Sequence, residues 1–562
     1  MNYPLLKRTL NLQVAVNWLI EDAKDDFFPD PLGFKEVSTL GKEYLEQREH
    51  RFLQVDAVTS RMEYVPKANG MLREAIWLHP NHRLLYLAAL HHLLPKIDNQ
   101  VLRCVYSYRR DAEPPDEYPF SRRIDRWKNF HNDFRAACLD NGTQAVLLTD
   151  IASFYDHINI DHLCDKLQSM LGKSCEETEL EVISLLRTLL LTWSTTGYGI
   201  PQNLDPSSFF GSVYLHIVDA AMEAQRYNYF RWVDDIRVCA KNRSQALRAL
   251  HFLQQELAKE RLFLASDKTK IIEKGSEEFE HLVDVEDDVL ISESEEAIAR
   301  GDRPELEAIA QKCMERVEFH ASPKGDDRKF RAFCNRLLDC ALFAELAVSI
   351  RPKVLDLVLP RLSTHVGRSD YWCKMLAVKP SEKVLAELDR LLIKEKSLFD
   401  WQRFHLWRLL TSFDVGVTGL ERFLGVAKSV ATNHVSELEA AQAMVFVGKH
   451  GSNPDREALF ASHFSSQKSY VIQRAVLLAI QELPANIRNR LYERAAQVNS
   501  EHRQLITYLS GLQTPDYGKG PRQERHCRPT PPKLTTAVKR GVGMVRGKPT
   551  RFRLARGDLD YE

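Results

Sequence analysis

The strongest constraint on the fold is an almost unbroken helical pattern in the C-terminal part of the chain. From about residue 295 to 512, apolar residues recur at helical spacing, and Gly, Pro and Asn fall mostly in the connections. Gln442, Gln473 and Gln504 open successive apolar helices 31 residues apart, and Gln402 is an earlier member at a longer spacing. This period predicts a stacked helical array, similar to HEAT repeats, with an ordinary helical bundle as the alternative.

The pattern before residue 290 is different. Residues 1 to about 95 predict amphipathic helices with short polar breaks, and the apolar run at residues 144–149 predicts a buried strand. The segments YNYFRW and IRVCA predict a strand pair on either side of Val233-Asp234-Asp235, and residues 244–262 return to a helical pattern. The fold class that follows is α+β.

Composition excludes several classes of protein. The longest apolar runs fall far short of the roughly 20 residues that a membrane span needs. The N-terminus lacks the apolar core and cleavage site of a signal peptide. Ten cysteines are scattered without a CxxC pair, which argues against a zinc ribbon or a disulfide framework and for a reducing interior.

A formal net charge of zero conceals a strong asymmetry. Residues 519–556 contain twelve Lys and Arg and one acid, so the rest of the chain is acidic. A basic tail on an acidic body is typical of an arm that binds phosphate groups, and a solvated tail without a ligand is the alternative.

Three acids fall where a metal site could form. Asp150 closes the apolar strand, and Asp234 and Asp235 occupy the turn between two further strands. Nucleotidyl transfer with two metal ions needs carboxylates in this arrangement, and oxygen ligands suit Mg²⁺. Taken singly, Asp150 could cap a helix and the Asp-Asp pair could be a solvated turn.

Four motifs in order strengthen the catalytic interpretation: TDIASFYDHI from Thr149, GIPQNLDPSS from Gly199, FRWVDDI from Phe230 and LASDKTKI from Leu264. Together they resemble the palm motifs of reverse transcriptases over roughly residues 100–290. The resemblance implies fingers and palm of a right-hand polymerase, followed by an all-α HEAT-like domain. It also implies two Mg²⁺ ions, or Mn²⁺, held by Asp150, Asp234 and Asp235 with help from the Ile151 carbonyl.

The same resemblance implies a set of nucleotide-binding residues. Tyr155, the fifth residue after Asp150, corresponds to the bulky aromatic that collides with a ribose 2′-hydroxyl, which predicts a DNA product. The other implied contacts are Gln202, Ser207, the motif lysine Lys268, and Arg123 and Lys128 in the fingers, where Arg122 and Arg126 are alternatives.

Three departures from the family pattern stand out. Trp232 replaces the usual Tyr before x-Asp-Asp, and Asn203 stands where Gly normally follows Gln202. The thumb motif expected after Ile272 is hardly recognisable, so we expect the helical half to hold the primer side.

The predicted organisation has four parts: residues 1–95 as a helical extension and fingers, 96–290 as fingers and palm, 291–515 as the helical-repeat domain, and 516–562 as a basic tail. A short polymerase followed by helical repeats resembles the abortive-infection and unknown-group reverse transcriptases of bacteria. This implies a cytoplasmic enzyme of antiviral defence that makes DNA from dNTPs on an RNA template, or without a template. The implied partners are nucleic acid, in some relatives a companion non-coding RNA, and further copies of the chain, with no membrane.

Two rival functions remain. One is a retron or group II intron-like reverse transcriptase that copies its own RNA, which the helical C-terminal half disfavours. The other is a helical-repeat binding scaffold with a catalytically silent palm, which the presence of all three acids disfavours.

Overall fold

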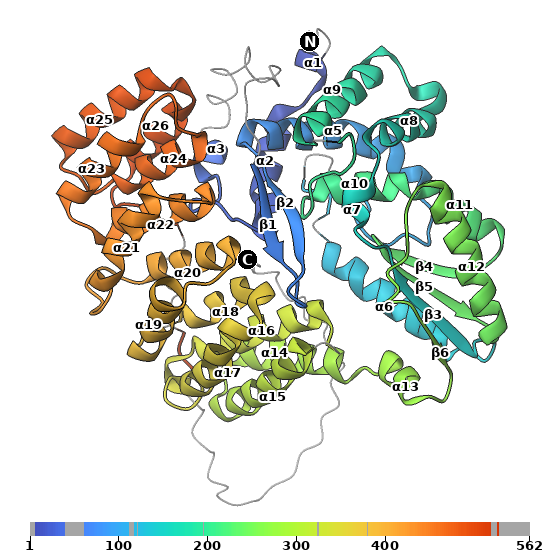
Figure 1. The fold of residues 1–562 in the computed structure, drawn as a ribbon. Helices are drawn as coiled ribbons and strands as arrows, with labels where there is room; N and C mark the ends of the chain where they lie inside the picture. The colour runs from blue at the N-terminus through green and yellow to red at the C-terminus, as the bar shows by residue number, and fades with distance from the viewer. Residues whose placement is uncertain are drawn as a thin grey trace, which may run out of the picture.

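The computed structural model describes residues 6–39, 61–111, 117–120, 122–194, 196–322, 325–378, 380–518 and 525–527. Figure 1 shows a β-hairpin in the middle of the molecule, a small sheet with its helices on one side, and an arc of helices on the other. The arc begins below the hairpin and ends beside the N-terminal helix α3 (Lys35–Thr39), which α26 (Arg503–Gly511) contacts.

The central hairpin corrects the prediction of helices throughout residues 1–95. Strands β1 (Arg61–Pro66) and β2 (Leu72–Trp77) pair antiparallel around a turn in which Gly70 has a φ of +82°. The buried ends of these strands pack on Trp401 and Phe404 of the helical half. The hairpin is therefore stabilised by residues more than 300 positions away, which local periodicity cannot reveal.

The four-stranded sheet confirms the predicted strands. Its order is β4-β5-β3-β6, with β3 (Ala145–Asp150) between β5 (Asp235–Ala240) and β6 (Lys270–Glu273), and β4 (Asn228–Trp232) at the edge. All neighbouring strands are antiparallel. The β3–β5 register sets Asp150 opposite Asp235. The last residue of β3 and the first residue of β5 therefore meet at the same end of these two inner strands.

Helices surround this sheet and share its hydrophobic core. Helices α12 and α6 contact the sheet, whereas α5, α8, α9 and α10 pack against one another beyond it. Their bounds, with those of the smaller helices, are α1 (Leu6–Thr9), α2 (Leu12–Asp22), α5 (Pro80–Ile97), α6 (Arg123–Leu139), α7 (Phe154–His157), α8 (Ile160–Leu171), α9 (Glu177–Trp193), α10 (Asp205–Tyr214), α11 (His216–Ala224), α12 (Arg243–Lys259) and α13 (Glu277–Val283).

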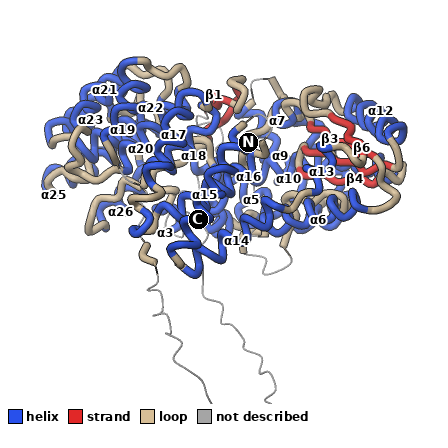
Figure 2. The backbone as a smooth tube through the Cα atoms, turned by 90° about the horizontal axis from the view of Figure 1, so that it is seen from below, coloured by secondary structure: helices blue, strands red, loops and turns tan. Residues whose placement is uncertain are grey.

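The helical half, residues 286–511, has its own hydrophobic core and lies opposite the sheet in Figure 2. Its α-helices are α14 (Glu286–Arg300), α15 (Arg303–Ala321), α16 (Asp327–Ala341), α17 (Arg351–Thr364), α18 (Ser369–Leu376), α19 (Glu382–Asp389), α20 (Asp400–Ser412), α21 (Glu421–Thr432), α22 (Glu437–His450), α23 (Asn453–His463), α24 (Tyr470–Ala479), α25 (Ala485–Val498) and α26.

Buried glutamines mark successive helices of this half. Gln402, Gln442, Gln473 and Gln504 lie in α20, α22, α24 and α26 and are all buried. Gln442 Nε2 of α22 donates a hydrogen bond to Thr411 Oγ1 of α20. Helix α18 packs on α20, α20 packs on α22, and α22 packs on α24. The repeated glutamine thus reports a repeated buried position, and the HEAT-like assignment of the array stays a prediction.

The N-terminal segment joins the two sides of the molecule. Asp22 of α2 accepts a hydrogen bond from the backbone N–H of Asp205, and Arg474 of α24 forms buried ion pairs with Asp30 and Glu36. Trp401 Nε1 of α20 donates to the Phe27 carbonyl at 2.8 Å. Residues 6–39 therefore bind both the helix α10 and the helical half.

Within the described residues, no helix is long and apolar enough to cross a membrane. Of the predicted basic tail, the described residues pack on the helical half. Asp516 bonds with Gln481, and the Arg525 backbone pairs with Leu342 and Ala344. The rest of the tail lies outside the described residues.

Candidate active site

The turn between β4 and β5 carries Asp234 in a constrained backbone. Val233 has a φ of +54°, which is rare for a β-branched residue and marks local strain. Ser107 Oγ accepts the Val233 N–H at 2.9 Å, and the fully buried Arg231 donates to the Val233 carbonyl at 2.8 Å while pairing with Asp219. The surrounding structure therefore holds Asp234 in place at the strand ends.

Asp150 reaches the same place from β3. The Ile151 N–H donates to the Asp234 carbonyl at 3.2 Å, which joins the end of β3 to the turn. Burial and the charge of Asp150 raise the pKa of Asp234 to about 7, and burial also raises the pKa of Asp150. Two partly buried carboxylates that disfavour each other's charge are a binding place for a cation.

Cationic side chains flank these acids. Lys268 Nζ lies 2.8 Å from Asp150 Oδ2, and Arg237 Nη2 lies 2.9 Å from Asp235 Oδ2. The predicted motif lysine is therefore in contact with the first predicted metal ligand. Asp235 is paired with Arg237 of its own strand.

Tyr155 stands on α7, directly after the β3 end. Its hydroxyl lies 2.9 Å from Ser208 Oγ of α10, and its ring packs on Phe154 at a centroid distance of 5.3 Å. The Ile200 N–H donates to the Tyr155 carbonyl, which ties α7 to the loop before α10. The predicted sugar gate is thus fixed at both its backbone and its ring.

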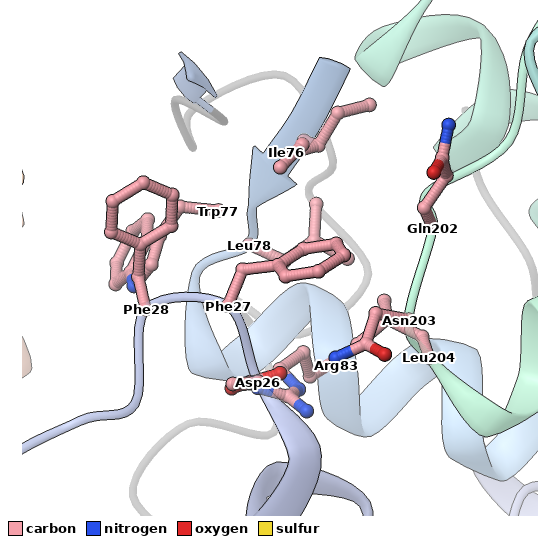
Figure 3. Close-up of a pocket in the computed structure, with 11 residues that line it drawn as sticks. Asp26, Phe27, Phe28, Ile76, Trp77, Leu78, Arg83, Gln202, Asn203 and Leu204 are labelled. Atoms are coloured by element: carbon pink, nitrogen blue, oxygen red, sulfur yellow. Dashed lines mark hydrogen bonds and ion pairs between the residues drawn. The ribbon is translucent and has the colours of Figure 1, made fainter. Parts of the chain in front are cut away.

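The loop that precedes α10 lines a pocket with the hairpin. Residues 202–204 lie on one side, and β2 with Phe27 lies on the other (Figure 3). Gln202 Nε2 donates to Asp156 Oδ1 at 2.6 Å. Asn203 has a φ of +62°, the left-handed conformation that the family's glycine would adopt and that Asn tolerates better than most residues.

The remaining predicted nucleotide contacts have other partners or positions. Ser207 is fully buried, and its hydroxyl lies 2.9 Å from that of Tyr86 on α5, so it is not accessible to a nucleotide. Arg123 forms an ion pair with Asp205 at 3.1 Å. Lys128 is exposed on α6. Ser207 and Arg123 therefore help to hold α10 in place through their contacts with Tyr86 and Asp205.

Arg73 is a residue that sequence analysis missed. It lies on β2, where burial and the charge of Arg331 lower the pKa of its guanidinium, and the nearby acids Asp327, Asp234 and Asp156 act against this shift. Its Nε is buried and has no hydrogen-bond partner among the described residues. A guanidinium in this position can receive a phosphate group. The hairpin, which the sequence pattern did not reveal, brings Arg73 near Asp234.

The donor set suits a hard cation. In the described ranges, no three His, Cys, Asp or Glu side chains converge closely enough to enclose a metal by themselves. Mg²⁺ commonly takes one or two carboxylates and completes its shell with water and substrate phosphate. Asp150 and Asp234, with raised pKa values and a mutual repulsion, fit that requirement.

Residues 90–297 match the family described as "Reverse transcriptase (RNA-dependent DNA polymerase)". The chain contains a reverse transcriptase domain. The matched range includes the strands β3 to β6, the turn of Asp234 and the loop of Gln202, so the resemblance seen in the four motifs is confirmed. The domain is that of an RNA-directed DNA polymerase.

Solved structures of low similarity align with a longer part of the chain than residues 90–297. Apo telomerase from Candida tropicalis is 12% identical, with a TM-score of 0.30 over 85% of this chain and 75% of that one. Telomerase from Candida albicans, in complex with a TWJ fragment of telomeric RNA, is 9% identical, with a TM-score of 0.29 over 85% and 70%. Similarity this low does not establish a shared overall fold. No curated protein matches the chain.

Proposed function

We propose that the chain synthesises DNA from dNTPs by nucleotidyl transfer with two metal ions, with Asp150, Asp234 and Asp235 as the ligands. The observation that supports this most strongly is the meeting of Asp150 and Asp234 at one sheet edge, beside Tyr155. When bound, Mg²⁺ would activate the primer hydroxyl and neutralise the triphosphate. The Ile151 carbonyl is a further candidate ligand.

The chain's own residues supply positioning and selection. Lys268 and Arg73 place positive charge around the carboxylates, where a triphosphate would lie. Tyr155 would contact the sugar of the incoming nucleotide, since its ring cannot move away without losing the bond to Ser208. A 2′-hydroxyl would then meet the ring, which favours dNTPs.

The biological role that we propose is antiviral defence against phage in the bacterial cytoplasm. The support is the resemblance of the chain to defence-associated reverse transcriptases, together with the continuous helical half behind the polymerase domain. The template, RNA or none, and a homo-oligomeric assembly belong to the same proposal.

The decisive test measures dNTP incorporation by the full-length protein with Mg²⁺, with an annealed DNA primer and RNA template or without a template. Asp234→Asn should reduce the rate by about a hundredfold to a thousandfold, because a preorganised electrostatic contact to the transition state is lost. Asp161→Asn is the matched control, because Asp161 forms only an exposed pair with Arg187. A folded Asp234→Asn protein with the wild-type rate would show that the site is misassigned.

A further inference from the structure

One arginine of the helical half reaches the catalytic turn. Arg328, in the first turn of α16, lies over Trp127 of α6 with its guanidinium carbon 3.5 Å from the ring centroid. The same carbon is 4.8 Å from the ring of Trp232. The two tryptophans meet edge to face at 4.9 Å, so they form one aromatic platform under the arginine.

Trp232 links this platform to catalysis. It is the last residue of β4 and precedes the strained Val233 and Asp234, and it is almost completely buried. This is also the position where the sequence departs from the Tyr of the family pattern. The larger ring of Trp232 supports a cation that comes from outside the reverse transcriptase domain.

The guanidinium of Arg328 is available to an anion. Arg328 is exposed, and its side chain has no hydrogen bond and no ion pair within 4.0 Å among the described residues. Burial lowers the pKa of the Arg328 guanidinium, and the carboxylates of Asp235, Asp326 and Asp234 act on it only at longer range. A cation that is fixed by stacking but lacks a carboxylate partner is well suited to bind phosphate.

More positive charge continues from Arg328 along the helical half. Arg331, one turn later on α16, pairs with Asp327 at 3.0 Å and lies 5.6 Å from the ring of Tyr371, and Lys374 Nζ lies 4.3 Å from the same ring. The charge of Arg331 also acts to lower the pKa of Arg73 on the hairpin, so these two cations lie near each other. Alternating cations and aromatic rings are typical of surfaces that follow a nucleic-acid strand.

We propose that Arg328 binds the backbone of the primer strand near its growing end and that Trp232 positions it there. The primer end must come to Asp150 and Asp234, and the phosphates just behind that end need a cation beside the β4–β5 turn. Arg328 is in that place, contributed by the helical half in a chain without a recognisable thumb motif. This inference rests on the proposed polymerase function, because it concerns the strand that is extended.

The test measures binding apart from catalysis. A fluorescently labelled DNA primer annealed to an RNA template is titrated with full-length protein in EDTA at several salt concentrations. Arg328→Ala and Arg328→Gln should each weaken binding about tenfold and reduce the salt slope by about 1, because one phosphate contact is lost. Arg328→Lys should keep the slope, since the charge remains. Arg422→Ala is the matched control, because Arg422 is an exposed arginine of the helical half that pairs with Glu382 and, like Arg328, lies near an aromatic ring, that of Phe423.

A second measurement separates strand binding from nucleotide binding and from packing. In steady-state incorporation, the KM for primer should rise in Arg328→Gln while the KM for dNTP stays unchanged, and the melting temperature should stay near that of wild type. Wild-type affinity and salt slope in both neutral variants would overturn the proposal and leave Arg328 as a packing contact.

Tighter binding in the neutral variants would also overturn it, because Arg328 would then obstruct the strand. If the wild-type protein binds the primer–template through Arg328 but incorporates no dNTP, the proposed function fails, and Arg328 binds a nucleic-acid backbone that is not extended as a primer.

Discussion

At the scale of single residues, Tyr155 is constrained more than a steric gate requires. Its hydroxyl is held by Ser208, its carbonyl accepts from Ile200, and its ring rests on Phe154. Burial also raises the pKa of its hydroxyl far above the usual range, so the group stays neutral and can donate or accept a hydrogen bond. The ring is therefore fixed in one place by three separate contacts.

Tyr155→Ala should increase the use of ribonucleotides relative to deoxynucleotides by about tenfold to a hundredfold, because the ring that excludes the 2′-hydroxyl is gone. The ratio of kcat/KM for a ribonucleotide and its deoxynucleotide measures this effect. Tyr155→Phe keeps the ring and loses only the bond to Ser208, so it should retain most of the discrimination. An unchanged ratio in Tyr155→Ala would rule out the gate.

The residues that local sequence could identify are those at strand ends. Asp150 and Asp234 follow apolar runs that predict strands, and both arrive at the expected edge. Arg73 and Arg328 could not be identified in this way, because each reaches the turn only through the packing of the helical half on the rest of the chain.

At the scale of elements, the β1–β2 hairpin is held from the helical side. Val65 and Ala75 pack on Trp401 and Phe404 of α20. Its turn lies so near η6 (Val366–Arg368) that a Cβ on Gly367 would be 2.6 Å from the Lys67 carbonyl carbon. The sequence pattern does not reveal the hairpin, because Val65 and Ala75 share their apolar cluster with residues of these distant helices.

Glu63 of β1 makes the contact between the hairpin and the helical half sensitive to pH. Burial raises its pKa to about 7, against the hydrogen bond from Ser436 and the charge of Arg61, while Asp400 and Glu437 raise it further. The pKa of Glu63 is higher in the folded protein than in the unfolded chain, so the protonated carboxyl stabilises the fold. Its contribution to the free energy of unfolding is fully present below about pH 4.5 and is lost as the pH rises through about 7.

Glu63→Gln should therefore be progressively more stable than wild type as the pH increases from 5 to 8, because glutamine keeps the contact with Ser436 and carries no charge. The difference in melting temperature between the two proteins, measured at half-unit steps, checks this. A constant difference across that range would mean that Glu63 does not titrate in the interface.

At the scale of the whole molecule, the N-terminal segment connects the reverse transcriptase domain to the helical half. Arg474 is buried between Asp30 and Glu36, with ion-pair distances of 2.7 and 2.6 Å. The sequence predicted a helical half, yet it could not show that half packed on residues 6–39, since buried ion pairs leave no periodic pattern.

Arg474→Met should destabilise the protein by about 3–5 kcal/mol, because two buried carboxylates lose their partner. Urea unfolding measures the change, and the triple variant with Asp30→Asn and Glu36→Gln should recover much of it. Arg187→Ala removes an exposed ion pair and should cost less than about 1 kcal/mol. A loss from Arg474→Met no larger than that would show that the pairs do not hold the two parts together.

The connection between Asp30 and Arg474 also has a consequence for biosynthesis. The two residues are 444 positions apart, and a ribosome makes them in that order. For most of translation, Asp30 and Glu36 have already been made but Arg474, which pairs with both, has not. The hairpin likewise lacks the helices that cover its apolar residues. Asp150 and Asp234 are thus synthesised long before the helices that hold the hairpin of Arg73 and that carry Arg328. A chain that stops before residue 474 keeps Asp30 and Glu36 without the arginine that neutralises them.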